Sequence, residues 1–399
     1  MPLDGVVADC IAHELNEELA GGRIAKIFQP EKEEICLHIW SKGVGRKLLI
    51  SVNPAYPRIH LTSVSKENPY NPPVFCMLLR KHLSGGKILG IGINDFERIF
   101  TISIESVNEL GEISVKKIAV EIMGRHSNII LVNENGKIID SIKHVDSGMS
   151  RVREVMPARE YILPPSQDKT SPVALDIEQI VGNVMMSGGN MSIEKYLLNN
   201  IKGFSPFLCR ELCFIAGIDE KTRAVDVVKD ESLTAGLKDA ICRVVNVIKN
   251  KDYKPCIVYK QDIGIESIPE TEKSPLDFHC LPIKQYSYVR YFDSMSYVLD
   301  KFYSEKDFME RLGQKKNSLA SDREKLKLYG ELITAYIHSI PANAKKVSLP
   351  NYYSPGNELV DIELDENKTP QETAQIYFRR YNKAKSTYYN TSRQIKETL

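Results

Sequence analysis

Short runs of alternating apolar and polar residues recur between residues 23 and 145, and turn-forming residues separate them. A period of two is typical of strands that bury one face, and tight turns between such runs favour an antiparallel sheet. The runs are 23–30, 34–40, 47–52, 58–62, 87–93, 98–106, 113–122, 128–133 and 137–145. Asn135-Gly136 predicts a hairpin between the last two. The N-terminal part of the chain is therefore restricted to folds built around a large, mostly antiparallel sheet.

Two helices are expected to interrupt this sheet. Segment 8–19 has apolar residues at helical spacing and is followed by Gly21-Gly22. Segment 74–83 follows a proline-rich stretch and ends at Gly85-Gly86, which predicts a second helix. Residues 4–160 are thus expected to form one mixed α and β region.

A proline-rich, polar stretch at 163–172 marks the first expected boundary, and a helical region follows it to about residue 250. Within that region a helix, a tight turn at Gly203 and a second helix have the sequence pattern of a helix-hairpin-helix. Ser205 is the expected N-cap of the second helix, Pro206 its first residue and Gly217 its end. Backbone amides at this helix start can hold one RNA phosphate, and a hairpin used only for packing is an equally good interpretation.

Two strand-like segments, 255–260 and 278–283, precede a C-terminal helical region. There Leu312, Leu319, Leu326 and Ile333 recur seven residues apart, which predicts a short coiled-coil arm. A second helix is expected to start at Thr369-Pro370, with Glu372 completing a capping box. The apolar residues on this second helix that are suited to pairing with the first arm are Ala374, Phe378, Tyr381 and Tyr388. The chain stops at Leu399 without a helix-ending signal, so we expect it to be part of a longer protein.

Composition narrows the class of protein. Lysine and arginine number 53 against 52 acidic residues, which excludes a histone-like electrostatic binder but leaves open a nucleic-acid partner that binds a local basic patch. No segment reaches the roughly 18 continuous apolar residues of a membrane span, and the N-terminus lacks the features of a signal peptide. A cytoplasmic location is therefore expected.

The eight cysteines are scattered and form no Cys-x-x-Cys pair, so we expect buried, reduced thiols. Only Cys209 and Cys213 are spaced to share a helix face. Because no second pair of metal ligands lies near them in the sequence, we do not expect a metal site there. No metal or other cofactor is expected.

The segment Val120 to Leu131 places polar side chains at a bend between two apolar runs. Gly124 permits a tight or left-handed bend, and Ser127 or Asn128 can satisfy backbone groups there without any ligand. If Glu121 and Arg125 are buried in one hairpin, they must be paired or face a cleft. The bend is therefore either a structural support or part of a binding site.

Many segments in order resemble the NFACT family, in particular the bacterial RqcH proteins that are often labelled fibronectin-binding protein A. They are "LDG" at 3–5, "HELNEEL" at 13–19, "GGRIAKIFQP" at 21–30, "NPPVFCMLLRKHLSGG" at 71–86, "EIMGRHSNIIL" at 121–131, "LPPSQDK" at 163–169, "KLYGELITA" at 327–335, "NYYSPG" at 351–356 and "KTPQETAQIYFRRYNKAK" at 368–385. The resemblance covers nearly the whole chain.

The resemblance implies an α+β architecture in three parts. Residues 1–170 would form an NFACT-N domain similar to the N-terminal domain of formamidopyrimidine-DNA glycosylases, 171–286 a helix-hairpin-helix region, and 287–399 a truncated coiled-coil and middle region. An RNA-binding NFACT-R domain is expected beyond Leu399.

The resemblance also implies a function. Such proteins bind the large (50S) ribosomal subunit that carries an obstructed peptidyl-tRNA, recruit alanyl-tRNA and promote alanine tailing of the stalled chain. Because the ribosome forms the peptide bonds, the protein would be a tRNA-positioning factor and not an enzyme.

Site residues follow from the same resemblance. The family's tRNA-handling pair corresponds to Glu97-Arg98, where relatives usually have Asp-Arg, so the carboxylate here has a longer reach. An arginine can grip a phosphate or a base edge while the carboxylate orients it. Without the resemblance, a surface ion pair worth about 0–1 kcal/mol would be the simpler interpretation.

The resemblance places further residues in or near the predicted tRNA-binding site. Asp4 aligns with an acidic position near the same site, and an N-cap of the first helix is its alternative role. Glu121, Arg125 and His126 are predicted either to touch tRNA or to support Arg98. A further phosphate contact is predicted at Gly203. Contacts with rRNA are predicted on a basic helical face formed by Arg379, Arg380 and Lys383, which extends to Lys385. The alternative is that this face is only solvated.

Two other functions remain open. A DNA glycosylase would use the amine of Pro2 as nucleophile after removal of Met1, although Leu3 replaces the glutamate that follows this proline in those enzymes. An adhesin that binds fibronectin would require export without a signal peptide.

Overall fold

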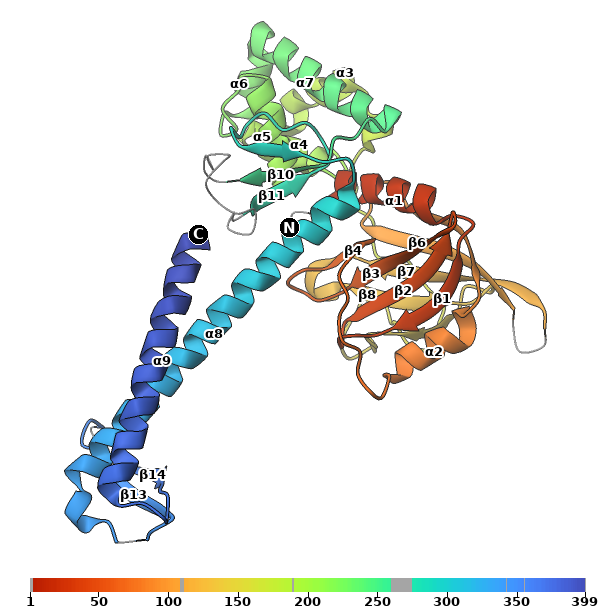
Figure 1. Cartoon of the computed structure of the whole chain (residues 1–399). Helices are drawn as coiled ribbons and strands as arrows, with labels where there is room; N and C mark the ends of the chain where they lie inside the picture. Colours follow the sequence, from red (N-terminus) through yellow and green to blue (C-terminus); the bar gives the residue numbers. More distant parts are fainter. Residues whose placement is uncertain are drawn as a thin grey trace. The chain divides into compact units, whose positions relative to one another are not determined.

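The computed structural model is shown in Figure 1. It describes residues 3–107, 111–188, 190–259, 275–341, 343–354 and 356–398, apart from the side chains of 187–188, 305–322 and 391–398. The chain divides into two compact units: unit 1 comprises Met1–Asp262 and Pro275–Tyr303, and unit 2 comprises Ile263–Ser274 and Ser304–Leu399. The boundaries expected at 170 and 286 both lie inside unit 1, so the three-part division stays a prediction.

A nine-stranded antiparallel sheet forms the first part of unit 1, as the alternating runs predict. Its strands are β1 (Arg23–Phe28), β2 (Glu34–Ser41), β3 (Val44–Ser51), β4 (Arg58–Leu61), β5 (Lys87–Ile93), β6 (Ile99–Val107), β7 (Ile113–Glu121), β8 (Asn128–Val132) and β9 (Ile138–Ser141). Their order is β4-β3-β2-β1-β5-β6-β7-β8-β9. The predicted turn at Asn135-Gly136 is confirmed, because Gly136 has a positive φ and β8 pairs with β9.

Two helices flank this sheet where the sequence predicts them. They are α1 (Gly5–Leu19) and α2 (Val74–Leu83), and Figure 1 shows them at opposite ends of the strands. Alternate strand residues such as Leu37 and Leu48 are fully buried together with the apolar face of α1. Such burial, at about 25 cal/mol per Å² of apolar surface, is the main source of the stability of this part.

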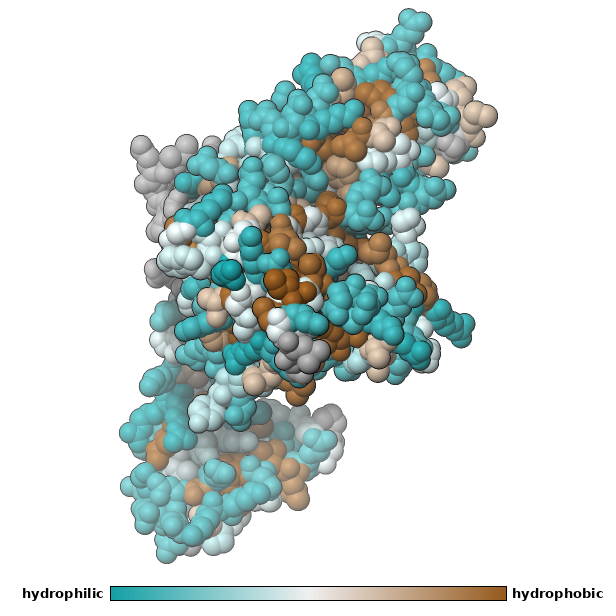
Figure 2. Space-filling model, turned by 90° about the vertical axis from the view of Figure 1, so that its right-hand side faces the viewer, coloured by the Kyte–Doolittle hydropathy of each residue, from teal (hydrophilic) through white to brown (hydrophobic). Residues whose placement is uncertain are grey.

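The long β6–β7 hairpin carries exposed apolar residues at its far end. Val107 pairs with Ile113 across the two strands, and both side chains are largely exposed. Figure 2 shows hydrophobic side chains gathered on part of the face that lies at the right of Figure 1, with hydrophilic ones around them.

The second part of unit 1 is helical and ends in a small sheet. Its elements are η2 (Pro172–Ala174), α3 (Ile177–Gly182), η3 (Val184–Gly188), α4 (Ile193–Asn200), α5 (Pro206–Ile215), α6 (Ala224–Lys229), α7 (Glu231–Asn250), β10 (Cys256–Tyr259), β11 (Pro275–His279) and β12 (Val289–Tyr291). The three strands have the order β11-β10-β12. The predicted cap is confirmed: Ser205 accepts a hydrogen bond from the Leu208 amide, with Pro206 at the first helical position. The three-residue strand β12 was not predicted from the sequence.

Unit 2 contains a two-stranded hairpin and two long helices. Its elements are α8 (Met295–Ala335), which begins in unit 1, η5 (Ile337–Ser339), β13 (Lys346–Pro350), β14 (Leu359–Glu363) and α9 (Pro370–Thr398). Leu332 and Ile333 of α8 are buried in one cluster with Ala374 and Tyr377 of α9. The two helices approach closely there: a Cβ at Gly330 of α8 would lie only 2.9 Å from the Phe378 ring of α9.

Several details of the α8–α9 prediction are tested by unit 2. The capping box is confirmed, since the Thr369 amide donates to Glu372 and the Glu372 amide to the Thr369 hydroxyl. The Arg323 guanidinium lies 4.8 Å from the centre of the Tyr388 ring, so this part of the predicted stripe also contacts α8. The side chains of Leu312 and Leu319 lie outside the described residues.

The cysteines differ in one respect from the expectation of buried thiols. All eight are free, but Cys36 is half-buried and Cys242 is exposed on α7, because position 242 lies on the solvent side of that helix.

Candidate functional site

The candidate site begins at a strained turn between β5 and β6. The Glu97 amide donates to the Asn94 carbonyl at 2.9 Å, and the two residues between them have positive φ, 42° for Asp95 and 59° for Phe96. Neither is a glycine, and the left-handed conformation costs a bulky residue such as Phe96 roughly 1–2 kcal/mol. Contacts from outside the hairpin must therefore hold this turn.

The backbones of α1 and of the α4–α5 connection supply these contacts. The Gly5 amide donates to the Gly203 carbonyl at 2.9 Å. A Cβ at Gly5 would lie 2.1 Å from the Phe96 carbonyl oxygen, and one at Gly203 would lie 2.8 Å from the Phe96 Cβ. Only glycine permits three backbone segments to pack this closely. Lys202 adds an ion pair, with Nζ 2.9 Å from Asp95 and 3.8 Å from Glu97.

Arg98 follows directly and is half-buried. Burial lowers the pKa of its guanidinium, and the negative charges of Asp4 and Glu97 oppose that shift. Its carbonyl accepts a hydrogen bond of 2.8 Å from the Ile122 amide, at the end of β7. Glu97 and Arg98 thus lie on a tightly braced turn, and the charge of Asp4, at the start of α1, acts on the Arg98 guanidinium.

Asp4 lies at the centre of a buried polar cluster and is 5% exposed. Its carboxylate accepts from the Val7 amide at 2.9 Å, from the Ser205 hydroxyl at 2.6 Å and from His279 Nε2 at 3.1 Å. Burial alone would raise the pKa of Asp4, but His279, Ser205 and the Val7 amide hold it below the usual range. The predicted N-cap role of Asp4 is confirmed, and a direct contact with RNA stays a prediction.

The bend predicted in the segment Val120 to Leu131 is a short 3₁₀ turn, η1 (Gly124–His126), between β7 and β8. Gly124 has a φ of 59°, as a left-handed bend requires. Ser127 accepts from the Met123 amide at 2.8 Å, and Asn128 bonds both the amide and the carbonyl of Lys143. The prediction that Ser127 and Asn128 satisfy backbone groups is confirmed.

Glu121 is fully buried beside this bend. The two terminal guanidinium nitrogens of Arg153 donate to its two oxygens, and the Tyr161 hydroxyl donates to Oε1 at 3.0 Å. Glu121 is therefore a buried carboxylate that is paired, as burial requires, whereas Arg125 lies on the surface and the buried pair is completed by Arg153, 32 residues away.

Arg125 and His126 are exposed, and Arg125 Nε donates to His126 Nε2 at 3.0 Å. Both line a cavity of about 490 Å³ whose wall also includes the charged residues Lys143, Arg153 and Glu121. Because Arg153 pairs with Glu121 and Lys143 pairs with Glu33, the positive charge that remains on the lining is that of Arg125. The cavity can therefore accept an anionic group.

The other predicted contacts lie elsewhere. The close packing of Gly203 against Phe96 and Gly5 directly supports the packing interpretation of that hairpin, while a phosphate contact there stays a prediction. Arg379, Arg380, Lys383 and Lys385 are all exposed on α9 in unit 2. Pro2, the nucleophile of the glycosylase alternative, lies outside the described residues.

Sequence reasoning missed Lys202, Arg153 and His279. Lys202 is adjacent to the predicted Gly203 turn, so a basic residue beside a predicted phosphate contact was an available signal. Arg153 and His279 lie 32 and 275 residues from their carboxylate partners, and no local pattern connects them.

Within the described ranges, no group of three or more His, Cys, Asp or Glu side chains is placed to hold a metal ion. No helix in that part of the chain is long and apolar enough to cross a membrane.

The family model of the NFACT N-terminal and middle domains matches residues 4–322 and 318–399. The chain belongs to the NFACT family. The Rqc2 homolog RqcH of Bacillus subtilis is 35% identical over 99% of this chain and 69% of its own length. The Rqc2 homolog RqcH of Streptococcus pneumoniae is 30% identical over 100% of the chain and 69% of its own length.

Two solved structures resemble this NFACT chain. A fibrinogen-binding protein from Staphylococcus aureus has a TM-score of 0.61 and 29% identity, covering 76% of this chain and 99% of that one. The N-terminal part of a fibronectin/fibrinogen-binding protein from Streptococcus suis has a TM-score of 0.59, with the same identity and coverage.

Proposed function

We propose that this chain is a ribosome-associated quality-control factor of the cytoplasm. It binds large ribosomal subunits that carry an obstructed peptidyl-tRNA and positions alanyl-tRNA so that the ribosome adds alanine to the stalled chain. On this proposal the protein supplies binding and orientation, and the ribosome performs the chemistry. Membership of the NFACT family and the similarity to RqcH proteins support the class of function.

The observation that carries the proposal is the braced turn that presents Glu97 and Arg98. Two non-glycine residues are held in a left-handed conformation directly before this pair, and strain of this kind is retained where surrounding structure requires a fixed geometry. A guanidinium so placed can grip an RNA phosphate or base edge with little further loss of entropy. Glu97 and Asp4 orient it.

The remaining predicted residues complete the proposal. Arg125 and His126 face a positively charged cavity and can meet a second phosphate, while Glu121 supports the bend through Arg153. The α4–Gly203–α5 segment would act as the helix-hairpin-helix, and α8 with α9 as a partial antiparallel coiled coil whose residues Arg379, Arg380 and Lys383 meet rRNA. Asp4 would contribute through Arg98 rather than by contact.

The test is recovery of alanyl-tRNA with tagged protein and large subunits, together with mass spectrometry of alanine tails on a stalled reporter. The full-length protein is used. The variant Glu97→Ala/Arg98→Ala should lose at least tenfold in both readouts, because removing a charged hydrogen-bonding group costs about 1.5–3 kcal/mol.

Arg243→Ala is the matched control, since it removes one exposed arginine paired with Asp239 on α7. Glu97→Asp restores the family's usual residue and should retain tailing. Unchanged alanyl-tRNA recovery in the double variant would reject the assignment of this pair.

A fibronectin-binding adhesin is the second candidate, because the two similar structures carry fibrinogen- and fibronectin-binding names. It predicts saturable binding of the chain to immobilised fibronectin and loss of the protein from intact cells on surface proteolysis. Protein that is untouched by such proteolysis would argue against it.

A further inference from the structure

Aromatic and basic side chains share the outer face of strands β1, β2 and β3. The strand register places Lys26 opposite His38 and His38 opposite Lys47. The same register places Phe28 opposite Cys36, two residues along β2. Because alternate residues of a strand point to the same side, these residues lie on one surface, while Leu37 and Ile39 point into the core. We call this surface the β1–β3 face.

Trp40, the single tryptophan of the chain, extends the β1–β3 face and is 60% exposed. It pairs with Gly45, and a Cβ at Gly45 would lie 3.9 Å from two ring carbons of Trp40. The indole therefore lies beside a backbone without a side chain, and much of its surface is open to solvent. A large exposed aromatic ring next to lysines is suited to stacking on another flat ring.

The charge of the β1–β3 face is positive. Within the described part of the chain, neither Lys26 nor Lys47 forms an ion pair. The nearest carboxylate on the face, Glu34, is buried and paired with Lys66 and Arg58. Two lysines are thus available to an anionic partner.

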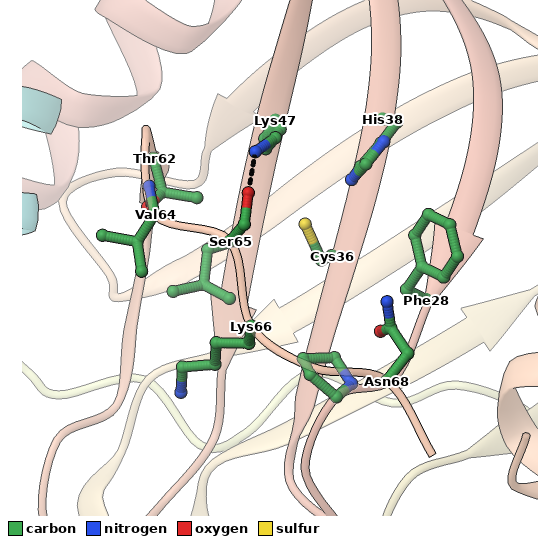
Figure 3. Close-up of a pocket in the computed structure, with 11 residues that line it drawn as sticks. Phe28, Cys36, His38, Lys47, Thr62, Val64, Ser65, Lys66 and Asn68 are labelled. Carbon is green, nitrogen blue, oxygen red and sulfur yellow. Dashed lines mark hydrogen bonds between the residues drawn. The ribbon is translucent and has the colours of Figure 1, made fainter. Parts of the chain in front are cut away.

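A pocket of about 140 Å³ opens beside the two lysine-bearing strands. Figure 3 shows the loop that carries Ser65, Lys66 and Asn68 passing across the strands that carry Lys47, Cys36 and Phe28. Lys47 donates to the Ser65 hydroxyl at 2.5 Å, which ties this loop to the sheet. No carboxylate is among the residues that line the pocket.

The chemistry of the pocket wall is that of a site for a flat, polar ring. The Phe28 and His38 rings lie 4.8 Å apart and form one side. Burial, together with Lys47 and Lys26, lowers the pKa of His38, which favours the neutral ring, and a neutral imidazole has one donor and one acceptor nitrogen. Asn68 adds an amide with the same two capacities. These groups match the edge of a nucleobase, whereas an acidic peptide would need only the lysines.

We propose that the β1–β3 face binds a single-stranded RNA segment, with one unstacked base in the pocket beside Phe28, another base on Trp40, and phosphates at Lys26 and Lys47. Single strands are recognised in this way because their bases are free to stack on aromatic side chains and bond through their edges. The site goes beyond the proposed function, and none of the contacts described for Asp4, Glu97 or Arg98 involves the face.

Trp40 itself reports binding. The chain 1–399 is titrated with single-stranded adenine and uracil octamers, with their duplex, and with polyglutamate, while tryptophan fluorescence is recorded. We expect the single strands to quench Trp40 and the duplex and polyglutamate to leave it unchanged. Lys26→Ala/Lys47→Ala should weaken binding and lower the salt dependence by about 0.7 per lost phosphate contact.

Phe28→Ala should weaken binding on the order of tenfold, as expected for loss of one stacked base. Matched controls are Phe214→Ala, which removes an exposed phenylalanine, and Lys221→Ala, which removes an exposed lysine. Each variant is checked by thermal unfolding, and His38→Ala provides a second test of the pocket. Arg98→Ala should leave quenching unchanged, which separates this proposal from the proposed function.

Competition by tRNA or by large-subunit rRNA identifies the source of the strand, and displacement by either supports the proposal. An unchanged Trp40 signal with every RNA would overturn it. Equal quenching by the duplex would also overturn it, because the face would then bind nucleic acid without preference for single strands. Equal quenching by polyglutamate would overturn it in favour of peptide binding.

Discussion

Removing the arginine that holds Glu121 should destabilise unit 1 and disturb the bend next to Arg98. Arg153→Ala leaves a fully buried carboxylate without its bidentate partner, and Arg153 itself is only 13% exposed. Breaking a buried pair by removing one partner costs about 3–5 kcal/mol. Tyr161 still donates to Glu121, and one such bond is worth about 1 kcal/mol, so we expect about 3 kcal/mol.

Thermal unfolding followed by circular dichroism measures this loss. At about 2–4 °C per kcal/mol for a unit of this size, the midpoint should fall by roughly 6–12 °C. The control is Arg159→Ala, which breaks an exposed pair with Glu154 and should cost at most about 1 kcal/mol.

A second variant separates the loss of the charge pair from the loss of packing. Glu121→Gln in the Arg153→Ala background removes the unpaired charge, so part of the lost stability should return. If Arg153→Ala unfolds at the same temperature as Arg159→Ala, the buried Glu121 carboxylate does not depend on Arg153 for its stability.

Gly5→Ala should lower the free energy of unfolding by about 1–3 kcal/mol, because the new Cβ overlaps the Phe96 backbone. Gly182→Ala is the control, since open space surrounds Gly182 in α3, and it should be neutral or stabilising. Denaturation midpoints of the two variants measure the difference. The folded-state pKa of Asp4 lies below its usual range, so its carboxylate stabilises the fold at neutral pH and this contribution is lost as the pH falls through the lowered pKa. Asp4→Asn should therefore be less stable than the parent protein at pH 7 and should lose less stability on acidification, and equal acid sensitivity of the two proteins would contradict this. Ile333→Ala should cost about 2–5 kcal/mol in unit 2, measured by protection of α9 amides from hydrogen exchange, and unchanged protection would contradict the packing described.

The parts of the fold predicted from sequence are those set by local chemistry. Gly21-Gly22 ends α1, Asn135-Gly136 forms the hairpin turn, and Ser205 and Thr369 cap their helices because each signal acts over three or four residues. The strand β12 was missed because three residues are too few for a periodic pattern.

The candidate site was predictable only in part, because its polar residues meet through tertiary contacts. Glu97 and Arg98 were found through a resemblance to relatives, and the strain before them became visible only in the φ angles of Asp95 and Phe96. The partners Arg153 and His279 come from distant segments, and a carboxylate in the sequence does not indicate which cation will reach it.

On the proposed function, Glu97-Arg98 positions alanyl-tRNA on the large ribosomal subunit. The most direct measurement is the amount of alanyl-tRNA recovered with large subunits by full-length protein and by its Glu97→Ala/Arg98→Ala variant. We predict at least a tenfold loss in the variant, with ribosome binding retained. Equal recovery from the two proteins would contradict the claim.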